Sequence, residues 1–488
     1  MLRKLIAQWF AQTRRSAAKA TDNQGPARQT GTDAQVLATE LALGKRAHLA
    51  GDHKIAQAHY RNALAIDAQH PETLFCLGVA HHSQKQLDEA LRLCHQAYEL
   101  DSSQATWRES LMHIANDIGK AEGIARCEVW VRDKTDFASW MGLGNALRHE
   151  GQLEAARHAY QQALEHQPRS VFAWRRLGCL YAAMGALDEA DRCFRHSAAG
   201  GLRPDALLHF SNDHLEGLYK NRAQLVKGIA SPDGNFTPTE SPIVLLLCGD
   251  SVYMHKFAYA LIKSARKHGN TDACYHLHVV NPDGQIAALI EAIRAELTPS
   301  IRYSWETLAL SPDVDPRTYY ACARFLHLPW FIGQYQRPIL CLDLDLLVSG
   351  DLGEIFRLVD SRDVGLLQWH ATRWDPWEQF SASVLYVRAS SGGLAFASLM
   401  AAYIQEAIAS QTADWFLDQI ALYAAHALIR QHPEIATTVY LPTNVCRVAG
   451  SVDETPDSSS VLWTLAYRSH NGAELPAAYG PYLSSTNT

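Results

Sequence analysis

The residues best suited to chemistry lie at the end of an apolar run, in the segment PILCLDLDLLVSGDL at 338–352. Asp343 and Asp345 are two residues apart, so their carboxylates project to one side at the end of a strand. Two like charges in so apolar a segment are unfavourable unless a cation lies between them. Their oxygen ligands suit a hard divalent ion, Mg²⁺ or Mn²⁺. A D-x-D taken alone is more often a structural turn, and the strand-like setting is what favours a metal site.

This segment resembles the metal-binding D-x-D of the GT-A nucleotide-sugar glycosyltransferases. It is most similar to glycosyltransferase family 8, the group of lipopolysaccharide glucosyl- and galactosyltransferases and glycogenin. The similarity extends over most of 241–475, through LLLCGDSVYMHKFAYALIKSARKHG, YYACARFLHLPWFI, FSASVLYV, WFLDQIAL and YRSHNGAELP. The resemblance implies a GT-A fold and a metal-dependent transfer of sugar from a nucleotide-diphosphate donor, with retention of the anomeric configuration.

The resemblance also implies the roles of individual residues. Asp343, Asp345 and His470 would be the metal ligands, and Asp418 and Gln419 would be the catalytic residues. Those two would orient the reacting sugar or stabilise its oxocarbenium character, and neither would be a nucleophile. The residues that the resemblance places at the nucleotide donor are Cys248, Asp250, Tyr253, Arg324, Leu344, Ser381, Ser383, Asn471 and Gly472. The arginine among them would neutralise the diphosphate.

The chain departs from the family pattern in three places. Ser381 stands where the family has Asn, and the terminal Lys-Pro-Trp is missing, with AELP in its place at 473–476. The segment 370–380 has no counterpart in the pattern, so the acceptor cannot be inferred from it. Four aromatic residues in this region could form a floor on which a sugar stacks or could belong to the core; they are Trp369, Trp374, Trp377 and Phe380.

Beyond residue 240, short β-rich runs alternate with helical stretches, which indicates an α/β domain. The pattern predicts strands at 243–248, 275–280, 301–305, 339–348, 364–369, 384–387, 438–441 and 461–467. It predicts helices at about 256–267, 286–297, 317–333, 391–409 and 415–430. The metal and donor residues thus follow strands or lie on helices that a sheet would hold together.

The first half of the chain carries a repeat of 34 residues. Gly44, Gly78, Gly144 and Gly178 keep this period, with a middle interval of nearly two periods. Twelve residues after each glycine is an alanine, and sixteen after it is Tyr60, Cys94, Tyr160 or Phe194. Small residues let two helices approach closely, and the aromatic is expected to fill the groove against the neighbouring repeat. Turn glycines at 51, 151 and 185 mark the break between the helices of a pair.

These spacings resemble the tetratricopeptide repeat. Repeats are predicted at 37–70, 71–104, 137–170 and 171–204, a degenerate copy at 105–136, and a final covering helix at 205–229. Such a solenoid has no chemistry of its own but offers a concave surface to a peptide, a partner protein or a second copy of the chain. A purely structural arm is the alternative.

Composition sets the wider limits. The chain has 488 residues, is 47% hydrophobic and 19% charged, and carries a net charge of −7, which argues against nucleic acid as a partner. No apolar run approaches the roughly 20 residues of a membrane span. The ten cysteines are scattered without a C-x-x-C motif, and several stand at apolar positions typical of reduced core thiols. Together with the lack of a secretory leader at the N-terminus, they predict a cytoplasmic protein. Residues 1–20 are basic and amphipathic, so they could lie on the inner membrane surface; a frayed helix that docks on the protein itself is the alternative.

The predicted organisation is multidomain: a tail and linker at 1–34, an all-α repeat solenoid at 35–229, a linker at 230–240 and an α/β GT-A domain at 241–488. The predicted function is a glycosyltransferase whose solenoid recruits the acceptor, a protein or a glycan, or a partner. A catalytically silent scaffold is the main alternative. A GT-B transferase fits poorly, because that class lacks a D-x-D metal site and requires more chain than 241–488 offers.

Overall fold

The structure, a computed structural model, describes residues 31–483 except 102–106, 108–109, 111–113, 115–119, 134, 201–204, 206, 237–238, 271, 309–314, 369–374, 450–453, 457–458 and 466–476. The basic tail at 1–20 therefore lies outside the described residues. By its internal contacts the chain divides into two compact units, Met1–Leu177 and Gly178–Thr488. We describe each unit by itself.

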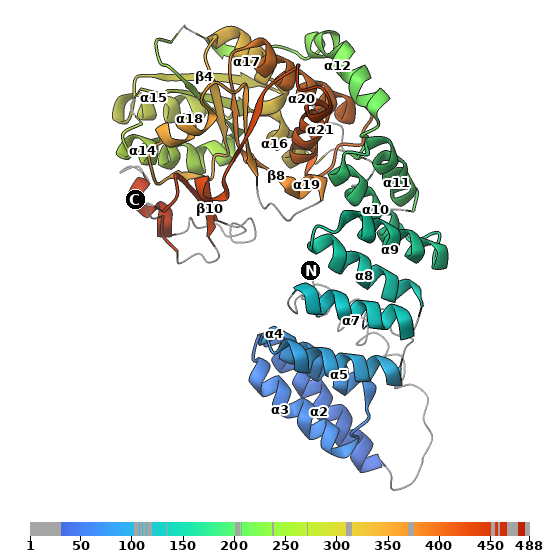
Figure 1. The fold of residues 1–488 in the computed structure, drawn as a ribbon. Coiled ribbons are helices and arrows are strands. Elements are labelled where there is room, and N and C mark those ends of the chain that lie inside the picture. Colours follow the sequence, from blue (N-terminus) through green and yellow to red (C-terminus); the bar gives the residue numbers. More distant parts are fainter. Residues whose placement is uncertain are drawn as a thin grey trace. The chain divides into compact units, whose positions relative to one another are not determined.

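The first unit is a series of helix pairs, coloured blue to teal in Figure 1. Its helices are α2 (Gly31–Ala50), α3 (His53–Ile66), α4 (Pro71–Ser83), α5 (Leu87–Leu100), α7 (Lys120–Asp133), α8 (Phe137–His149) and α9 (Leu153–His166). The next helix, α10 (Val171–Met184), begins in this unit and ends in the second. Two helices fall in each of the repeats predicted at 37–70, 71–104 and 137–170, so the helical-repeat prediction is confirmed there.

The period-setting glycines are sites of close helix packing. A Cβ atom on Gly144 would lie 2.6 Å from Cδ1 of Tyr160, and one on Gly178 would lie 2.8 Å from Cε1 of Phe194. Each aromatic thus packs on the glycine of its own repeat, whereas the sequence suggested the groove of the neighbouring one. The turn glycines Gly51 and Gly151 have φ of +90° and +71°, a conformation that L side chains rarely adopt.

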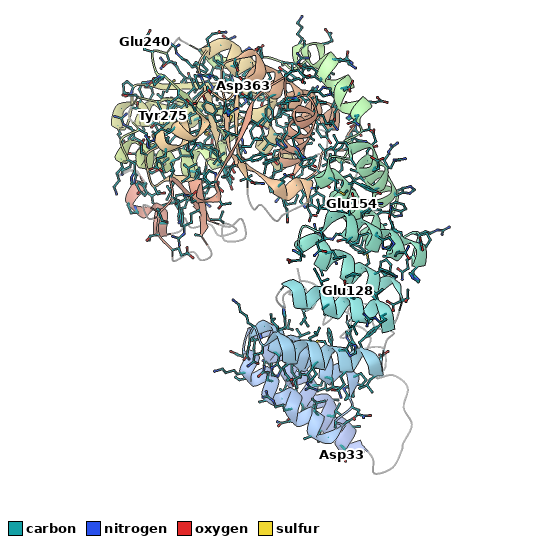
Figure 2. The ribbon with its side chains drawn as sticks, in the orientation of Figure 1. Asp33, Glu128, Glu154, Glu240, Tyr275 and Asp363 are labelled. Atoms are coloured by element: carbon teal, nitrogen blue, oxygen red, sulfur yellow. The ribbon has the colours of Figure 1, made fainter. Side chains whose placement is uncertain are left out.

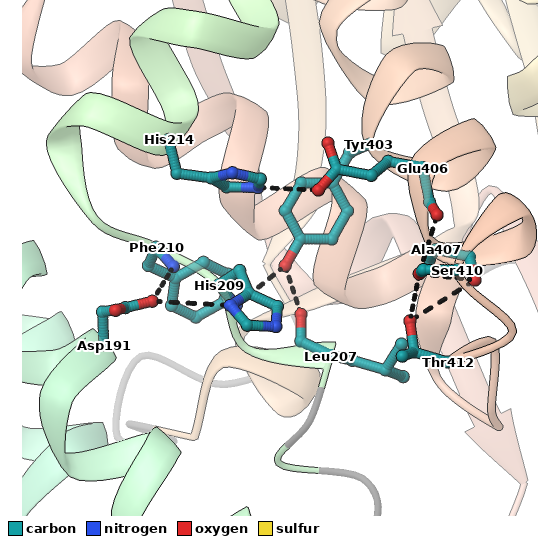
Figure 3. Close-up of polar contacts among 10 residues, drawn as sticks. All are labelled: Asp191, Leu207, His209, Phe210, His214, Tyr403, Glu406, Ala407, Ser410 and Thr412. Atoms are coloured by element: carbon teal, nitrogen blue, oxygen red, sulfur yellow. Dashed lines mark hydrogen bonds and ion pairs between the residues drawn. The ribbon is translucent and has the colours of Figure 1, made fainter.

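The second unit begins with the end of α10, α11 (Leu187–Ala199) and α12 (Asn212–Lys227). Figure 3 shows how the segment before α12 joins α11 to the long helix α20 (Ser391–Ala409). The Asp191 carboxylate accepts a hydrogen bond from the Phe210 backbone N–H at 3.1 Å. The Tyr403 hydroxyl donates to the Leu207 carbonyl and accepts from the His209 backbone N–H at 3.3 Å. The predicted covering helix therefore also packs on α20.

The rest of this unit is built on a mixed sheet of eight strands in the order β1-β4-β3-β2-β5-β8-β7-β9. Their bounds are β1 Asp233–Asn235, β2 Val244–Asp250, β3 Cys274–Val280, β4 Ile301–Glu306, β5 Ile339–Leu342, β7 Val364–Gln368, β8 Phe380–Val387 and β9 Thr438–Leu441. Strands β4, β3, β2 and β5 run parallel, and β8 is antiparallel to both of its neighbours. A small sheet joins β10 (Cys446–Ala449), β11 (Leu462–Leu465) and β6 (Leu347–Val348).

Helices cover both faces of the large sheet (Figure 1). Leu245 and Leu247 of β2 pack in the core that holds α14 (Tyr259–Lys267) and α15 (Ile286–Glu296). Val244 and Leu246 face the opposite core, with α16 (Pro316–Leu326), α17 (Leu328–Tyr335), α20 and α21 (Leu417–Gln431). Successive residues of a strand point to opposite faces, which is why β2 is apolar throughout. Tyr275 on β3 is completely buried within this architecture (Figure 2).

The remaining elements of the unit are short. They are α13 (Ser251–Tyr253), the π-helical η2 (Met254–Ala258), α18 (Gly353–Val359), α19 (Pro376–Gln379), η3 (Thr443–Val445) and η5 (Ala477–Tyr482). By length and composition α20 is the one helix among the described residues that could cross a membrane, although 72% of the window concerned is buried in the unit. All ten cysteines are buried, which confirms the core position predicted for several of them.

The strand predicted at 384–387 begins four residues earlier, as β8 (Phe380–Val387), and two other predicted elements are each divided in the structure. The strand predicted at 339–348 is two strands, because pairing with β8 ends at Leu342 and the chain then turns, with the Leu346 N–H 3.3 Å from the Asp343 carbonyl. The helix predicted at 317–333 is also two, α16 and α17, which meet at His327, two residues before Pro329 in the first turn of α17. The linker predicted at 230–240 contributes β1, which pairs with β4.

Candidate functional site

The sheet topology brings the candidate residues to one edge. The chain proceeds from β2 outward to β3 and β4 and then returns to the other side of β2 as β5. In parallel α/β sheets the crevice at such a reversal, outside the carboxyl ends of the strands, is where ligands bind. Asp250 is the last residue of β2 and Asp343 follows the last residue of β5. The two residues therefore belong to the reversal point.

Strand β8 adds the two serines from its antiparallel side. Leu342 at the end of β5 is opposite Val384, and the Asp343 backbone N–H donates to the Ser383 carbonyl at 3.0 Å. The Ser383 N–H in turn lies 3.3 Å from the hydroxyl of Ser381, which is buried. The structure thus brings Ser381 and Ser383 beside the D-x-D segment.

Three acidic side chains and one arginine gather at this edge, and we call Arg324, Asp343, Asp345 and Asp418 the carboxylate cluster. The Arg324 guanidinium is 3% exposed, with Nη1 2.6 Å from Asp343 Oδ1 and Nη2 4.0 Å from Asp418 Oδ2. Nη2 also donates to the Ala382 carbonyl at 3.0 Å, while Nε has no hydrogen-bond partner in the described part of the chain. The resemblance placed Arg324 at a diphosphate; in the structure its partners are two carboxylates.

Asp345 has the most unfavourable environment in the carboxylate cluster. Burial, and secondly the nearby charge of Asp343, raise the pKa of its carboxyl to about 7. Its backbone carbonyl accepts hydrogen bonds from the Tyr479 hydroxyl at 2.6 Å and from Thr464 Oγ1 at 3.3 Å. Burial also raises the pKa of Asp418, although the charge of Arg324 opposes that shift. The carboxylate cluster therefore holds more negative charge than one arginine compensates.

The loop after β2 contains the remaining donor residues. The Asp250 carboxylate caps α13 by accepting from the Tyr253 N–H at 2.8 Å, and Tyr253 is 37% exposed. Cys248 is buried, with Sγ 3.9 Å from the Tyr320 carbonyl. A Cβ atom on Gly249 would lie 2.7 Å from Cδ1 of Leu344, so this loop packs directly on the D-x-D segment.

A hollow of about 470 Å³ lies at Ser381, Ser383, Cys446, Arg447 and Thr464. Its size is within the range of small-molecule sites. Burial raises the pKa of the Cys446 thiol, and the charges of Asp343 and Asp345 raise it further. Thr464, which lines the hollow, donates to the Asp345 carbonyl at 3.3 Å. No sequence signal pointed to Cys446 or Thr464, because β10 and β11 meet the D-x-D segment through long-range contacts, the small sheet and the Thr464 hydrogen bond.

The other predicted site residues have mixed outcomes. Gln419 follows Asp418 at the start of α21, where its N–H donates to the Asp418 carboxylate at 2.8 Å. Phe380 is completely buried with its ring centroid 4.7 Å from that of His426, so it belongs to the core and cannot be a sugar-stacking floor. Trp377 is partly buried against the same core. His470, Asn471, Gly472, Trp369 and Trp374 lie outside the described residues.

Comparison with known proteins identifies the repeats. Tetratricopeptide-repeat family models match residues 41–105 and 137–170. No curated protein matches. Among solved structures, a crystal structure of MamA is 22% identical, covers 32% of this chain and 94% of its own, and has a TM-score of 0.26. TTC0263, a thermophilic TPR protein in Thermus thermophilus, is 18% identical, covers 34% of this chain and 91% of its own, and has a TM-score of 0.26.

A third solved structure, YrrB, is described as a TPR protein with an unusual peptide-binding site. It is 15% identical, covers 37% of this chain and 97% of its own, and has a TM-score of 0.26. The repeat period in the sequence, the helix pairs and the two family matches agree. Residues 41–105 and 137–170 are tetratricopeptide repeats, and the chain combines a helical repeat solenoid with a C-terminal region of mixed sheets and helices.

Proposed function

We propose that the sheet-bearing region is a metal-dependent glycosyltransferase of the GT-A type, which moves a sugar from a nucleotide-diphosphate donor to an acceptor. The observation that carries the proposal is the carboxylate cluster at the point where the strand order reverses. The hollow beside Ser381 and Ser383 offers room for a ligand next to it. Retention of the anomeric configuration follows from the resemblance to glycosyltransferase family 8.

The side chains of the carboxylate cluster fit a hard divalent cation. Its three aspartates offer carboxylate oxygens, which are the ligands that Mn²⁺ and Mg²⁺ prefer. The pKa of Asp345 is raised to about 7 by burial and by Asp343, so a cation that favours the ionised form would relieve this environment. Asp343 and Asp345 would hold the ion, and His470 would be the third ligand. When bound, the cation would stabilise the negative charge that develops on the diphosphate leaving group.

The residues of this chain would mainly orient the reacting groups and the nucleotide. Arg324 fixes the Asp343 carboxylate through the 2.6 Å contact and approaches Asp418, so we assign it a positioning role. Asp418, 13% exposed at the start of α21, would face the reacting sugar together with Gln419. Asp250, Tyr253 and the buried Cys248 would hold the nucleotide at the end of β2.

The repeats would recruit the acceptor, whether a protein or a glycan, or another partner, including a second copy of the chain. Tetratricopeptide solenoids present concave surfaces for such contacts. The second candidate function is a scaffold in which the sheet region is catalytically silent. The repeats themselves favour it, since they account for a binding function without any chemistry.

The test is a panel of nucleotide sugars incubated with the full-length chain and Mn²⁺, with release of the nucleotide diphosphate as the readout. We expect one donor to be hydrolysed or transferred, and Asp345→Asn to lower the rate by about 100-fold or more. Asp351→Asn is the matched control, because Asp351 lies in the same segment with its carboxylate 56% exposed. Chelation of the metal should abolish turnover. Nucleotide release by neither wild type nor control, or equal rates for Asp345→Asn and wild type, would leave the scaffold as the better account.

A further inference from the structure

A second group of metal-ligating side chains lies at the same edge of the sheet, on the other side of β2. We call His278, Glu306 and His327 the histidine cluster. They come from near the end of β3, from the end of β4 and from the junction of α16 and α17. His278 Nε2 is 3.1 Å from Glu306 Oε1, and His327 Nε2 is 3.0 Å from Glu306 Oε2. One potential ligand atom of each residue lies within 4.8 Å of the others.

The histidine cluster is shielded from water. The side chains of His278 and His327 are 0% and 2% exposed, and that of Glu306 is 14% exposed. Two of the ligating groups also have a supporting partner, since His278 Nδ1 is 2.8 Å from Ser304 Oγ and the Tyr319 hydroxyl donates to Glu306 Oε2 at 3.0 Å. Outer partners of this kind orient the ligands of protein metal sites.

We propose that His278, Glu306 and His327 form a zinc site, separate from the carboxylate cluster. Two imidazoles and one carboxylate are a donor set that zinc uses in proteins, with a water as the fourth ligand. Tetrahedral zinc with bonds of about 2.0–2.1 Å holds its ligand atoms roughly 3.3 Å apart. The imidazole–carboxylate separations are 3.1 Å to Glu306 Oε1 and 3.0 Å to Glu306 Oε2, so the carboxylate would bind the ion through both oxygens or rotate to present one oxygen to it.

A series of hydrogen bonds behind His278 can form both without metal and with zinc bound. His276 Nε2 is 2.8 Å from Ser304 Oγ, and His276 Nδ1 is 2.6 Å from the Tyr335 hydroxyl. Without metal, His278 Nε2–H donates to Glu306, and each group behind it donates one step towards His278. With zinc on Nε2, the proton of His278 lies on Nδ1, and Ser304 and His276 reverse their donor and acceptor roles. The metal therefore fixes a tautomer that can be observed.

The proposed zinc would tie three elements together. His327 joins α16 to α17, and Arg324 of the carboxylate cluster is three residues before it on α16. An ion on His278, Glu306 and His327 would thus fasten this helix junction to the ends of β3 and β4. Because metal binding adds to the free energy of folding, loss of the ion should lower the thermal midpoint of the second unit.

The test uses the full chain, stripped with a chelator, incubated with zinc and passed over a sizing column before metal analysis. We expect about one zinc per chain in wild type and in Asp345→Asn, which separates this site from the proposed Mn²⁺ or Mg²⁺ site. Glu306→Gln and His327→Gln should lose it, and Ser304→Ala should bind about 10- to 100-fold more weakly. His426→Gln is the matched control, since His426 is buried but bonded to Tyr440 instead. Zinc that stays in both ligand variants, or a folded wild type that retains none, overturns the proposal.

A second measurement needs no variant. Cobalt(II) added to the stripped wild type should give the intense visible bands of four- or five-coordinate ligation by imidazole nitrogen. Nitrogen chemical shifts should show the proton of His278 moving from Nε2 to Nδ1 when zinc is added. Weak bands of six-coordinate oxygen ligation, or an unchanged tautomer, would contradict the assignment even if the ligand variants fail to fold.

Discussion

The carboxylate cluster and the histidine cluster lie at one edge of the same sheet, and they shift the pKa of a buried acid in opposite directions. In the carboxylate cluster, burial and the charge of Asp343 raise the pKa of Asp345 to about 7. In the histidine cluster, burial alone would raise the pKa of Glu306, but hydrogen bonds from His278 and His327 outweigh it and lower the pKa to about 2. One acid is destabilised by its surroundings and the other is stabilised.

The difference separates a cluster whose buried acid is not compensated without a cation from a cluster whose acid is already hydrogen-bonded before any metal binds. Arg324 contacts Asp343 and Asp418, and its charge only partly offsets the burial and repulsion that raise the pKa of Asp345. Glu306 receives three donors, from Tyr319, His278 and His327. Removing a charged group should therefore affect function most in the carboxylate cluster and stability most in the histidine cluster, with Arg324 as the exception.

Arg324→Met should give the largest loss of stability. It leaves Asp343 and Asp418 without the cation that they share, and breaking a buried pair in this way costs about 3–5 kcal/mol of unfolding free energy. Urea unfolding of the full chain with a chelator present measures it. Arg317→Met is the control, because Arg317 is 68% exposed and its pair with Asp315 should contribute at most about 1 kcal/mol. Equal losses for the two variants would mean that Arg324 does not organise the carboxylate cluster.

The elements differ in how far the sequence alone could predict them, for physical reasons visible in particular residues. Helix pairs and turns were predictable because Gly44, Gly144 and their aromatic partners are local signals that repeat. The strands β2, β3, β4 and β9 were also predictable, since each is one unbroken β-rich run. The break after Leu342 was not, because strand β5 ends where its pairing with β8 ends, and pairing is a long-range property.

The same contrast applies to the two sites. Asp343 and Asp345 are two residues apart, so a motif revealed them, and Arg324 and Asp418 followed from a resemblance. His278, Glu306 and His327 are separated by 28 and 21 residues along the chain and meet only through the register of β3 with β4 and the bend at His327. The alternate histidines of CYHLHVV in β3 were the one local signal, and alone they indicate only one face of a strand.

Two changes of acid to amide should act in opposite directions. Glu306→Gln replaces an ionised acceptor of three hydrogen bonds and should lower the unfolding free energy by about 1.5–3 kcal/mol. Asp345→Asn removes a carboxylate whose ionised form is disfavoured, so it should raise the unfolding free energy by roughly 1–2 kcal/mol at neutral pH. Both are measured by urea unfolding with a chelator present. A loss in both variants would show that the two buried acids do not differ as we infer.

The pH dependence of these two effects should also be opposite. The pKa of Asp345 is raised in the folded chain, so its contribution to stability is full below 3.8 and is lost as the pH rises towards about 7. The gain from Asp345→Asn should therefore grow over that interval. The pKa of Glu306 is lowered, so its contribution is full above 4.5 and is lost as the pH falls towards about 2. The loss from Glu306→Gln should shrink there. Unfolding curves at several pH values, with wild type as reference, test both slopes, and parallel slopes would contradict the comparison.

Tyr319→Phe should have the smallest effect, and it tests whether the two clusters are energetically separate. The change removes the hydroxyl that donates to Glu306 Oε2 at 3.0 Å, while His278 and His327 continue to donate, so a loss of about 0.5–1.5 kcal/mol is expected. Combined with Glu306→Gln it should be non-additive, because both changes alter the same hydrogen bond. Combined with Asp345→Asn it should be additive within about 0.5 kcal/mol. Tyr319 and Arg324 both lie on helix α16, however. Energetic coupling between Tyr319 and Asp345 would therefore mean that α16 links the two clusters. Zinc bound at the histidine cluster would then alter the affinity of the carboxylate cluster for its cation.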